Sequence, residues 1–221
     1  MSAAGDVWAV IPVKETVGAK QRLAPLLSPA LRQALALAML EDVLTAVAGV
    51  RDLGGAIVVT VDGEAERLAR RCGMATLADG ARDGHTGAVN AGARHLVAQG
   101  VPTMLTLPGD LPLATAAEIE RLIAAHGPAP AFTIAPAHDD LGSNAIIMSP
   151  PQAVPLRFGE DSFFPHLAAA RAKGIEPCVL RLPGIACDID NPQDLQHFAR
   201  LRSTTRAATL IAAHAKEMRV E

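Results

Sequence analysis

The stretch TMLTLPGDLP (residues 103–112) runs from an apolar segment directly into a stiff acidic turn. Its first half is typical of a buried strand, and its second half holds Asp110 between two prolines, which restrict the backbone. A second acidic motif, DIDNP (residues 188–192), follows another apolar run near the C-terminus. Residues that follow strands lie at the carboxyl-end edge of a parallel sheet, where α/β proteins bind ligands. The two motifs therefore predict an α/β fold with a ligand site at that edge.

Strand-like and helix-like patterns alternate along the whole chain, as expected for a mostly parallel sheet. Ser28 followed by Pro29 predicts the start of a helix that runs to about Ala48. We expect strands at 7–12, 56–61, 103–107, 132–135, 144–148 and 178–182, and other helices at 64–72, 87–99, 115–125, 162–173 and from Pro192 into the tail. No linker-like composition divides the 221 residues, so we expect one domain over 1–221, with 203–221 as a helical tail.

The composition favours a small-molecule partner. The chain has 20 Lys and Arg against 23 Asp and Glu, a net charge of -3, so it has no positive field for nucleic acid or an anionic membrane. One Trp, five Phe and no Tyr give no platform for stacking bases. The apolar stretch 31–47 is interrupted by charges and predicts a buried helix rather than a membrane span. Three cysteines without metal-binding spacing and the absence of a signal-peptide pattern predict a cytoplasmic protein.

The loop after the first expected strand carries the cations that a polyphosphate needs. It leaves the strand at Pro12 and contains Lys14, Lys20 and Arg22. Hydrogen bonds from Lys and Arg to phosphate oxygens are charge-assisted and strong. The loop has neither GxGxxG nor Walker A spacing, which excludes a dinucleotide fingerprint and a P-loop. The residues alone leave a solvated surface loop as an alternative.

Asp110, Asp188 and Asp190 are the predicted metal ligands. Asp188 and Asp190 lie on the same side of an extended segment, because side chains alternate with a period of two. Like charges side by side are costly unless something neutralises them, so a shared Mg²⁺ explains the three carboxylates better than three separate turn or capping roles. We therefore place these aspartates and Lys20 at the catalytic centre.

The segment 78–90 is a weaker candidate for contacts with a nucleotide base. Its glycines let backbone approach a planar ligand, and side-chain amides can read a base edge. The candidates there are Asp83, Gly84 and Asn90. Four histidines in expected helices have no nucleophile or second ligand at helical spacing, and we predict surface or core roles rather than catalysis for His95, His126, His166 and His197.

Six motifs, taken in order, resemble those of the guanylyltransferases of coenzyme F420 biosynthesis. They are PVK (12–14), AKQRL (19–23), GDLP (109–112), GSNA (142–145), FGEDSF (158–163) and DIDNPQDL (188–195), and the match spans roughly residues 7–200. The resemblance implies a single-domain nucleotidyltransferase fold, similar to the GT-A and molybdenum cofactor guanylyltransferase group. It would have a mixed, mostly parallel central sheet flanked by helices.

The resemblance also implies a reaction. A small phosphorylated acid (phosphoenolpyruvate, 2-phospho-L-lactate or 3-phospho-D-glycerate) attacks the α-phosphate of GTP and releases pyrophosphate, with Mg²⁺ as the metal. Carried over by motif, the cationic loop holds the triphosphate, and the acceptor is held by Ser143, Asn144, Gly159 and Ser162. The family commonly has threonine where Ser143 stands, so the hydroxyl is kept. Ser162 starts an expected helix, whose N-terminal amides favour an anion.

Alternatives remain at this point. The first loop lacks the glycine-rich sequence of the molybdenum cofactor enzymes, which favours the F420 branch. Another GT-A type nucleotidyltransferase or glycosyltransferase could use the same carboxylates and cations, and so could a noncatalytic nucleotide-binding subunit. A pure binder would not need three acids around one metal. An apolar helix or the pair Phe163–Phe164 could support a homodimer. The sequence does not select the acceptor, the guanine-reading residues or the number of metal ions.

Overall fold

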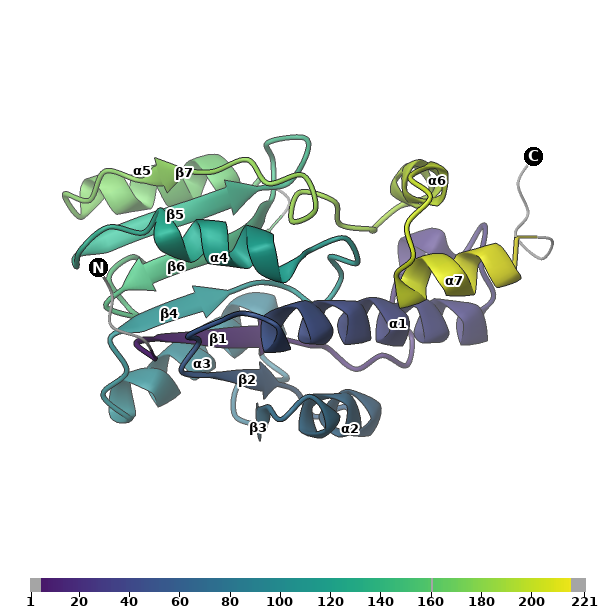
Figure 1. Cartoon of the computed structure of the whole chain (residues 1–221), viewed down its shortest axis with the longest axis horizontal. Helices are drawn as coiled ribbons and strands as arrows, with labels where there is room; N and C mark the ends of the chain where they lie inside the picture. Colours follow the sequence, from purple (N-terminus) through teal and green to yellow (C-terminus); the bar gives the residue numbers. More distant parts are fainter. Residues whose placement is uncertain (1–4, 160, 216–221) are drawn as a thin grey trace.

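The computed structural model describes residues 5–159 and 161–215, which contain a central seven-stranded sheet (Figure 1). Its strands are β1 Val7–Pro12, β2 Gly55–Val59, β3 Ala75–Leu77, β4 Thr103–Thr106, β5 Ala131–Pro136, β6 Ser143–Ser149 and β7 Cys178–Val179. Their order is β3-β2-β1-β4-β6-β5-β7. Strand β6 pairs antiparallel with β4 and β5, and the other neighbours pair in parallel. The prediction of a mixed, mostly parallel sheet is confirmed.

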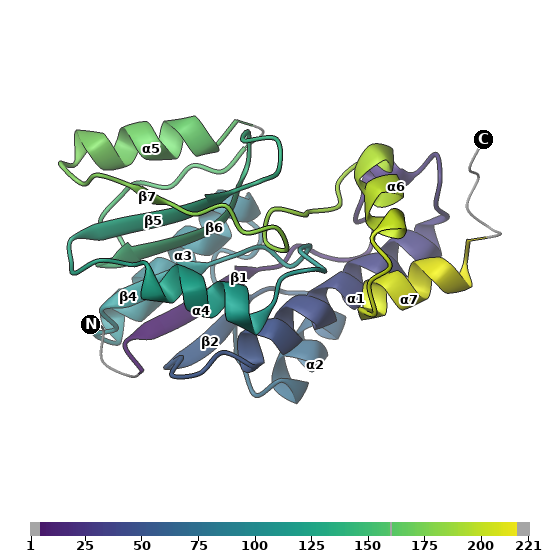
Figure 2. The ribbon, with the colours of Figure 1, turned by 45° about the horizontal axis from the view of Figure 1, so that its top comes forward.

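Helices cover both faces of this sheet (Figure 2). The helices of the described residues are α1 Pro29–Ala48, α2 Gly63–Arg71, α3 Gly84–Ala98, α4 Ala116–Ala124, α5 Phe163–Ala172, α6 Pro192–Arg200 and α7 Arg206–Ala213, with a 3-10 turn, η1, at Gln21–Leu23. One buried apolar cluster joins the sheet to α1, α2 and α4, and a second joins its other face to α3 and α5. None of the described helices is long and apolar enough to cross a membrane.

Local signals explain where the main helices begin. Ser28 accepts a hydrogen bond from the backbone of Leu31 at 3.3 Å, and Pro29 occupies the first turn of α1, as the sequence predicts. Helix α3 lies directly on β1 because Gly92 has no side chain: a Cβ there would stand 2.5 Å from Val10. This close approach brings the start of α3 to the edge of the sheet.

One expected element is wrong, and one strand was missed. The helix after Pro192 does not continue into the tail: α6 ends at Arg200, and Thr205 caps a separate helix, α7, by accepting from the backbone of Ala208. The short edge strand β3 was not expected, because three residues carry too little pattern to be recognised. Of the predicted helical tail 203–221, α7 is the helical part, and 216–221 lie outside the described residues.

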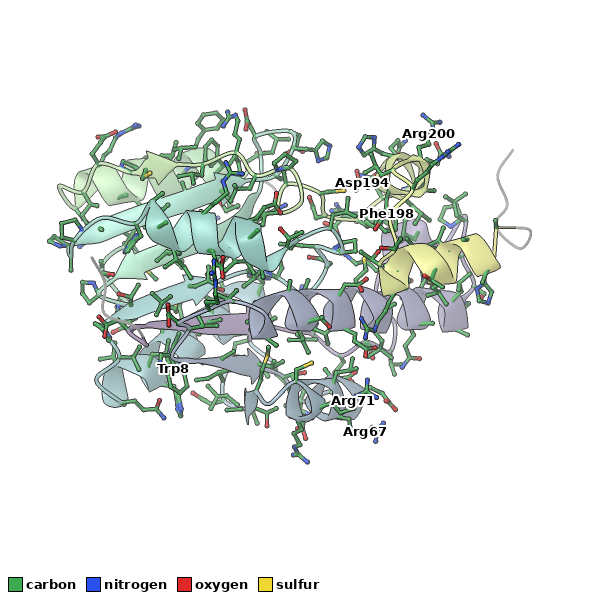
Figure 3. All side chains as sticks on the ribbon, in the orientation of Figure 1. Trp8, Arg67, Arg71, Asp194, Phe198 and Arg200 are labelled. Carbon is green, nitrogen blue, oxygen red and sulfur yellow. The ribbon has the colours of Figure 1, made fainter. Side chains whose placement is uncertain are left out.

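The C-terminal helices pack on the half of α1 that extends beyond the sheet. Apolar residues of α1, α6 and α7 form a third buried cluster there. Figure 3 shows Phe198 directed from α6 toward this cluster, whereas Arg200 points away from it. Asp42 of α1 accepts hydrogen bonds from the backbone of Arg206 and Ala207 at 2.9 and 3.0 Å and so fixes the start of α7. This packing holds the segment that carries Asp188 and Asp190.

The strand order creates a crevice at the carboxyl-end edge. Strands β2 and β3 lie on one side of β1 in the sheet, and β4 lies on its other side. The loops that follow β1 and β4 therefore lead in opposite directions and leave a space between them. Because β6 runs antiparallel, its first residues, Ser143 and Asn144, lie at this same edge. Segments that are far apart in the sequence therefore meet around one opening.

His126 is half-buried and connects the end of α4 to the sheet, in place of the catalytic role that the sequence argued against. Its Nδ1 lies 2.9 Å from Thr133 Oγ1 of β5, and its Nε2 lies 2.8 Å from Ser149 Oγ of β6. Ser149 in turn contacts Thr103 of β4 at 2.7 Å. Burial lowers the pKa of His126 to about 4, since the charged ring would lose its hydration.

We expect the free energy of unfolding to fall as the pH decreases from about 6.5 to about 4. In this window the unfolded chain protonates His126, while the folded protein keeps the ring neutral, so protons favour unfolding. Urea denaturation at several pH values measures the decline. His126→Gln should show a shallower decline than the wild type, and the exposed His138→Gln should not. Equal slopes for wild type and His126→Gln would contradict the assignment.

Candidate active site

The loops at the carboxyl-end edge surround a cleft of about 1080 Å³. Nearly all of the residues predicted from the sequence line it: Pro12, Lys14, Lys20, Arg22, Asp83, Gly84, Asp110, Ser143, Asn144, Gly159, Ser162, Asp188 and Asp190. Asn90 is the exception. It is half-buried in the second turn of α3, away from the lining of the cleft, because the helix starts at Gly84 rather than at Gly87.

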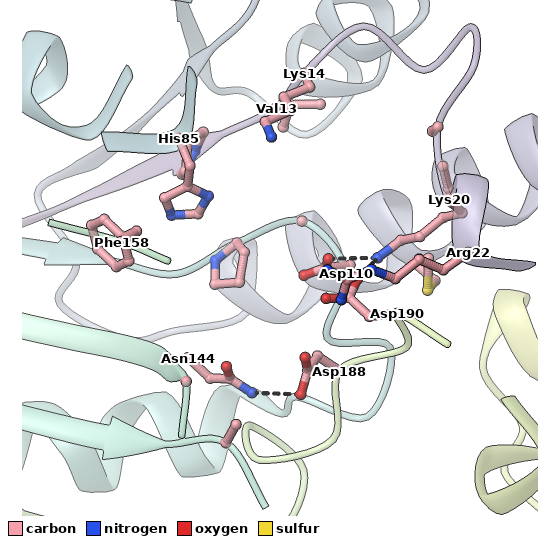
Figure 4. A pocket seen from close by; sticks show the side chains of 18 of the residues that line it. Val13, Lys14, Lys20, Arg22, His85, Asp110, Asn144, Phe158, Asp188 and Asp190 are labelled. Atoms are coloured by element: carbon pink, nitrogen blue, oxygen red, sulfur yellow. Dashed lines mark hydrogen bonds and ion pairs between the residues drawn. The ribbon is translucent and has the colours of Figure 1, made fainter. Parts of the chain in front are cut away.

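Lys20 forms the central contact of the cleft. Its Nζ lies 2.7 Å from Asp110 Oδ2 and 2.7 Å from Asp190 Oδ1, and its side chain is 11% exposed (Figure 4). The backbone of Lys20 is left-handed, with φ 52°, immediately before η1. This conformation costs free energy for a residue with a side chain, and the two ion pairs offset that cost. The cationic loop is thereby tied to both acidic motifs.

The protonation states follow from this contact. Burial alone would lower the pKa of Lys20, but Asp110 and Asp190 outweigh it, so the pKa rises and the ammonium is retained. Burial likewise raises the pKa of Asp110, but the charge and hydrogen bond of Lys20 bring it below the ordinary value. The pKa of Asp188 is raised by burial, and Asp110 and Asp190 add to the rise although a bond from Asn144 opposes it. Lys20 thus neutralises two of the three carboxylates.

The three aspartates line one cleft without forming a ready-made metal centre. Within 5–159 and 161–215, no three His, Cys, Asp or Glu side chains are grouped closely enough to hold an ion. The ammonium of Lys20 lies between Asp110 and Asp190, and Asp188 Oδ1 instead accepts from Asn144 Nδ2 at 3.1 Å. The donor set nevertheless fits Mg²⁺, which prefers carboxylate oxygens. The metal therefore stays a prediction.

The DIDNP motif is held by its own capping box. Asp194 accepts from the backbone of Asp190 and Asn191 at 2.9 and 3.0 Å, and Asn191 accepts from the backbone of Gln193 and Asp194. Ile189 is fully buried between the two acids of the motif. The alternation sends Ile189 into the third apolar cluster and both flanking carboxylates to the cleft, as the sequence predicts.

The opposite wall of the cleft carries two adjoining hydroxyls. Ser162 Oγ donates to Ser143 Oγ at 3.1 Å, and both serines are buried. The amide of Asn144 has another function: its Nδ2 donates to the carbonyl of Ile185 and to Asp188, so in this structure it positions Asp188. Contact of Asn144 with the acceptor stays a prediction.

The helix that follows Ser162 offers fewer amides than expected. The backbone N–H of Phe163, the first residue of α5, donates to the carbonyl of Leu141 at 2.9 Å. Pro165 has no N–H to offer. An anion at this wall would therefore depend more on the Ser143 hydroxyl, to which Ser162 donates, than on the start of α5.

Sequence reasoning missed several residues that shape the cleft. Asp62, between β2 and α2, accepts from the backbone and the hydroxyl of Thr16 at 2.7 Å each and so anchors the cationic loop. Phe158 donates its backbone N–H to Thr86 at the start of α3, and its ring lies 4.4 Å from that of His85. Asp62 follows a strand, as Asp110 does, so its position was a usable signal. The contacts of Phe158 depend on tertiary structure alone.

Comparison with known proteins agrees with this geometry. The family model described as guanylyl transferase CofC like matches residues 7–209. The chain belongs to this family. The match confirms the resemblance seen in the six motifs and the prediction of a nucleotidyltransferase enzyme. It does not support the alternatives of a glycosyltransferase or a noncatalytic subunit.

Relatives of the CofC-like chain have similar lengths. A phosphoenolpyruvate guanylyltransferase of Rubrobacter xylanophilus is 38% identical over 199 residues, which cover 90% of this chain and 95% of that protein. A 3-phospho-D-glycerate guanylyltransferase of Colwellia psychrerythraea is 35% identical over 194 residues, covering 88% and 91%. A Desulfovibrio desulfuricans structure, assigned to the nucleotide-diphospho-sugar transferases, superposes with a TM-score of 0.75 at 16% identity, covering 96% of each chain. That similarity shows the shared fold.

Replacing Lys20 by Met should raise the pKa of Asp110. Without the ammonium, the effect of burial on that carboxyl is no longer opposed by Lys20, and we expect its pKa to rise above the ordinary value. Carbon NMR of labelled aspartate side chains, followed through a pH titration, measures the shift. Lys14→Met removes a cation from the same cleft and serves as the control, with little change expected at Asp110. An unchanged Asp110 in Lys20→Met would contradict the electrostatic account.

Proposed function

We propose that this chain transfers GMP from GTP to phosphoenolpyruvate and releases pyrophosphate. Relatives at 38% and 40% identity are named phosphoenolpyruvate guanylyltransferases, which supports this acceptor. The acceptor of the Colwellia relative, 3-phospho-D-glycerate, and 2-phospho-L-lactate are the alternatives within the same reaction. The guanosine diphosphate conjugate would enter assembly of the deazaflavin coenzyme F420.

The observation that carries the proposal is the pairing of two unlike walls in one cleft. One wall presents Lys20 with the acidic motifs, suited to a triphosphate and its metal. The other presents the hydroxyl of Ser143, to which Ser162 donates, and this hydroxyl suits a small anion. The cleft is about 1080 Å³, which is enough for a nucleotide beside a three-carbon acid. An enzyme that joins two phosphorylated compounds needs both walls.

The chemistry needs no protein nucleophile. An oxygen of the acceptor phosphate, already ionised near neutral pH, forms a bond to the α-phosphorus of GTP. The bond from that phosphorus to the bridging oxygen breaks, and its electrons leave with pyrophosphate. The protein must position two polyanions and neutralise the charge that accumulates between them. This agrees with a cleft lined by Asp, Lys and Ser side chains.

Asp110, Asp188 and Asp190 would hold the divalent metal, which neutralises phosphate charge when it is bound. With a metal charge beside Asp110 and Asp190, Lys20 would be available to bind the triphosphate. Lys14 and Arg22 line the same side of the cleft and would bind phosphate oxygens. We also propose that Pro12, Asp83 and Gly84 contact the guanosine portion of GTP. Asn90 does not line the cleft, so it would affect GTP binding only indirectly.

Other features of the proposal concern the protein as a whole. We propose a single catalytic domain in a reducing cytoplasm, without nucleic acid or membrane partners. Cys72, Cys178 and Cys187 are unpaired in the structure, which agrees with such a compartment. A homodimer would use Phe164, which is 60% exposed, rather than the whole Phe163–Phe164 pair, because Phe163 is buried.

Pyrophosphate release with Mg²⁺ tests the proposal. Release should require GTP together with one acceptor, and ATP should not replace GTP. Asp190→Asn should lower kcat about 100-fold or more, since one of the charges that balance the cleft is lost. Asp79→Asn, at an exposed position outside the cleft, should stay within about twofold. No release with any of the three acceptors, or release by Asp190→Asn at the wild-type rate, would refute the proposal.

A further inference from the structure

His166 of α5 lies behind the hydroxyl wall and makes contacts through both ring nitrogens. The side chain is buried, with the residue 1% exposed. The backbone N–H of Arg157 donates to Nε2 at 3.0 Å, and Nδ1 lies 2.9 Å from Ser143 Oγ. The ring therefore joins the segment before Gly159 to the first residue of β6.

These contacts determine which nitrogen of the ring carries the proton. A neutral imidazole has one donor nitrogen and one acceptor nitrogen. Because Nε2 accepts from Arg157, the proton resides on Nδ1, and Nδ1–H donates to Ser143 Oγ. Burial lowers the pKa of His166 to about 4, and the nearby His85 adds to this effect, so the ring is neutral near pH 7.

The direction of the Ser143 hydroxyl follows from the same geometry. Its oxygen accepts from His166 Nδ1 and also from Ser162 Oγ at 3.1 Å, which uses both acceptor positions of a hydroxyl. Its single hydrogen is left for a third direction, and Ser143 lines the cleft. A hydroxyl fixed in this way is a donor toward an anion and cannot turn its lone pairs toward it.

We propose that His166 is a positioning residue for the acceptor: it holds the Ser143 hydroxyl as a donor toward the acceptor's phosphate or carboxylate. The role rests on the proposed function, in which this wall holds the acid. The same ring holds the backbone of Arg157, two residues before Gly159. The next residue, Phe158, donates its backbone N–H to Thr86 on α3. The acceptor wall is thus tied to the start of α3, on the nucleotide side of the cleft.

Two substitutions separate the two contacts of the ring. In His166→Asn the amide nitrogen can take the place of Nδ1 and still donate to Ser143, but nothing replaces Nε2. In His166→Gln the amide oxygen can reach the place of Nε2 and accept from Arg157, while the donor to Ser143 is lost. Both variants place an amide side chain at position 166, and they differ in whether the contact with Ser143 or the contact with Arg157 is kept.

We expect His166→Gln to raise the KM for phosphoenolpyruvate about tenfold, the effect of a lost hydrogen bond to an anion, with the KM for GTP nearly unchanged. His166→Asn should raise it about threefold or less. In a Ser143→Ala background His166→Gln should add nothing further, because the histidine acts through that hydroxyl. His126→Gln is the control for losing a histidine outside the cleft that also bonds through both ring nitrogens. Equal losses in both His166 variants, a parallel rise in the KM for GTP, or full additivity with Ser143→Ala would overturn the proposal.

A second measurement does not depend on turnover. A long-range proton–nitrogen NMR spectrum of the wild-type protein reports which ring nitrogen of His166 is protonated, with His166→Gln identifying the signals. Protonation of Nδ1 is the expected result, and protonation of Nε2 would refute the role of His166. Failure of pyrophosphate release with Nδ1 protonated would instead count against the identity of the acceptor.

Discussion

The structure depends on one charge arrangement, the ammonium of Lys20 held between Asp110 and Asp190. Three carboxylates at one edge of a sheet repel one another, and burial makes this repulsion stronger. Lys20 neutralises two of them, while Asp188, to which the neutral amide of Asn144 donates, keeps a raised pKa. Because one ammonium faces three carboxylates, the site still favours a cation. In the proposed function, a metal–nucleotide complex would supply this cation, and Lys20 would bind a phosphate of the nucleotide.

The fold brings these charges together from distant parts of the chain. The strand order opens the crevice between the loops after β1 and β4, and the antiparallel β6 adds Ser143 to the same edge. The DIDNP segment reaches the edge because α6 and α7 pack on the overhanging end of α1. Each wall of the cleft is thus fixed by a different part of the core, which lets the two walls hold different anions.

Much of the fold and the acidic site could be predicted from the sequence, for a physical reason. Apolar runs followed by Asp110 and by Asp188-Ile189-Asp190 indicate strands that end in carboxylates, and strand ends share an edge. The partners within the site could not be predicted. Lys20 contacts residues 90 and 170 positions away, and the pairing of His166 with Ser143 exists only because β6 runs antiparallel before α5. Asn90 was misplaced because the start of α3 gives no strong capping signal: Asp83 makes no side-chain cap in the structure.

The central claim is that the Lys20 ammonium, beside Asp110 and Asp190, occupies a cation position. When the metal–nucleotide complex binds, its metal would take this position. A crystal structure of the protein with GTP and Mg²⁺ tests this most directly. The account predicts carboxylate oxygens of these two residues and Asp188 on the metal, at about 2.1 Å where they bind it directly, with Lys20 Nζ moved to a phosphate oxygen. A complex in which Lys20 keeps both ion pairs, and GTP and metal bind away from the aspartates, would contradict it.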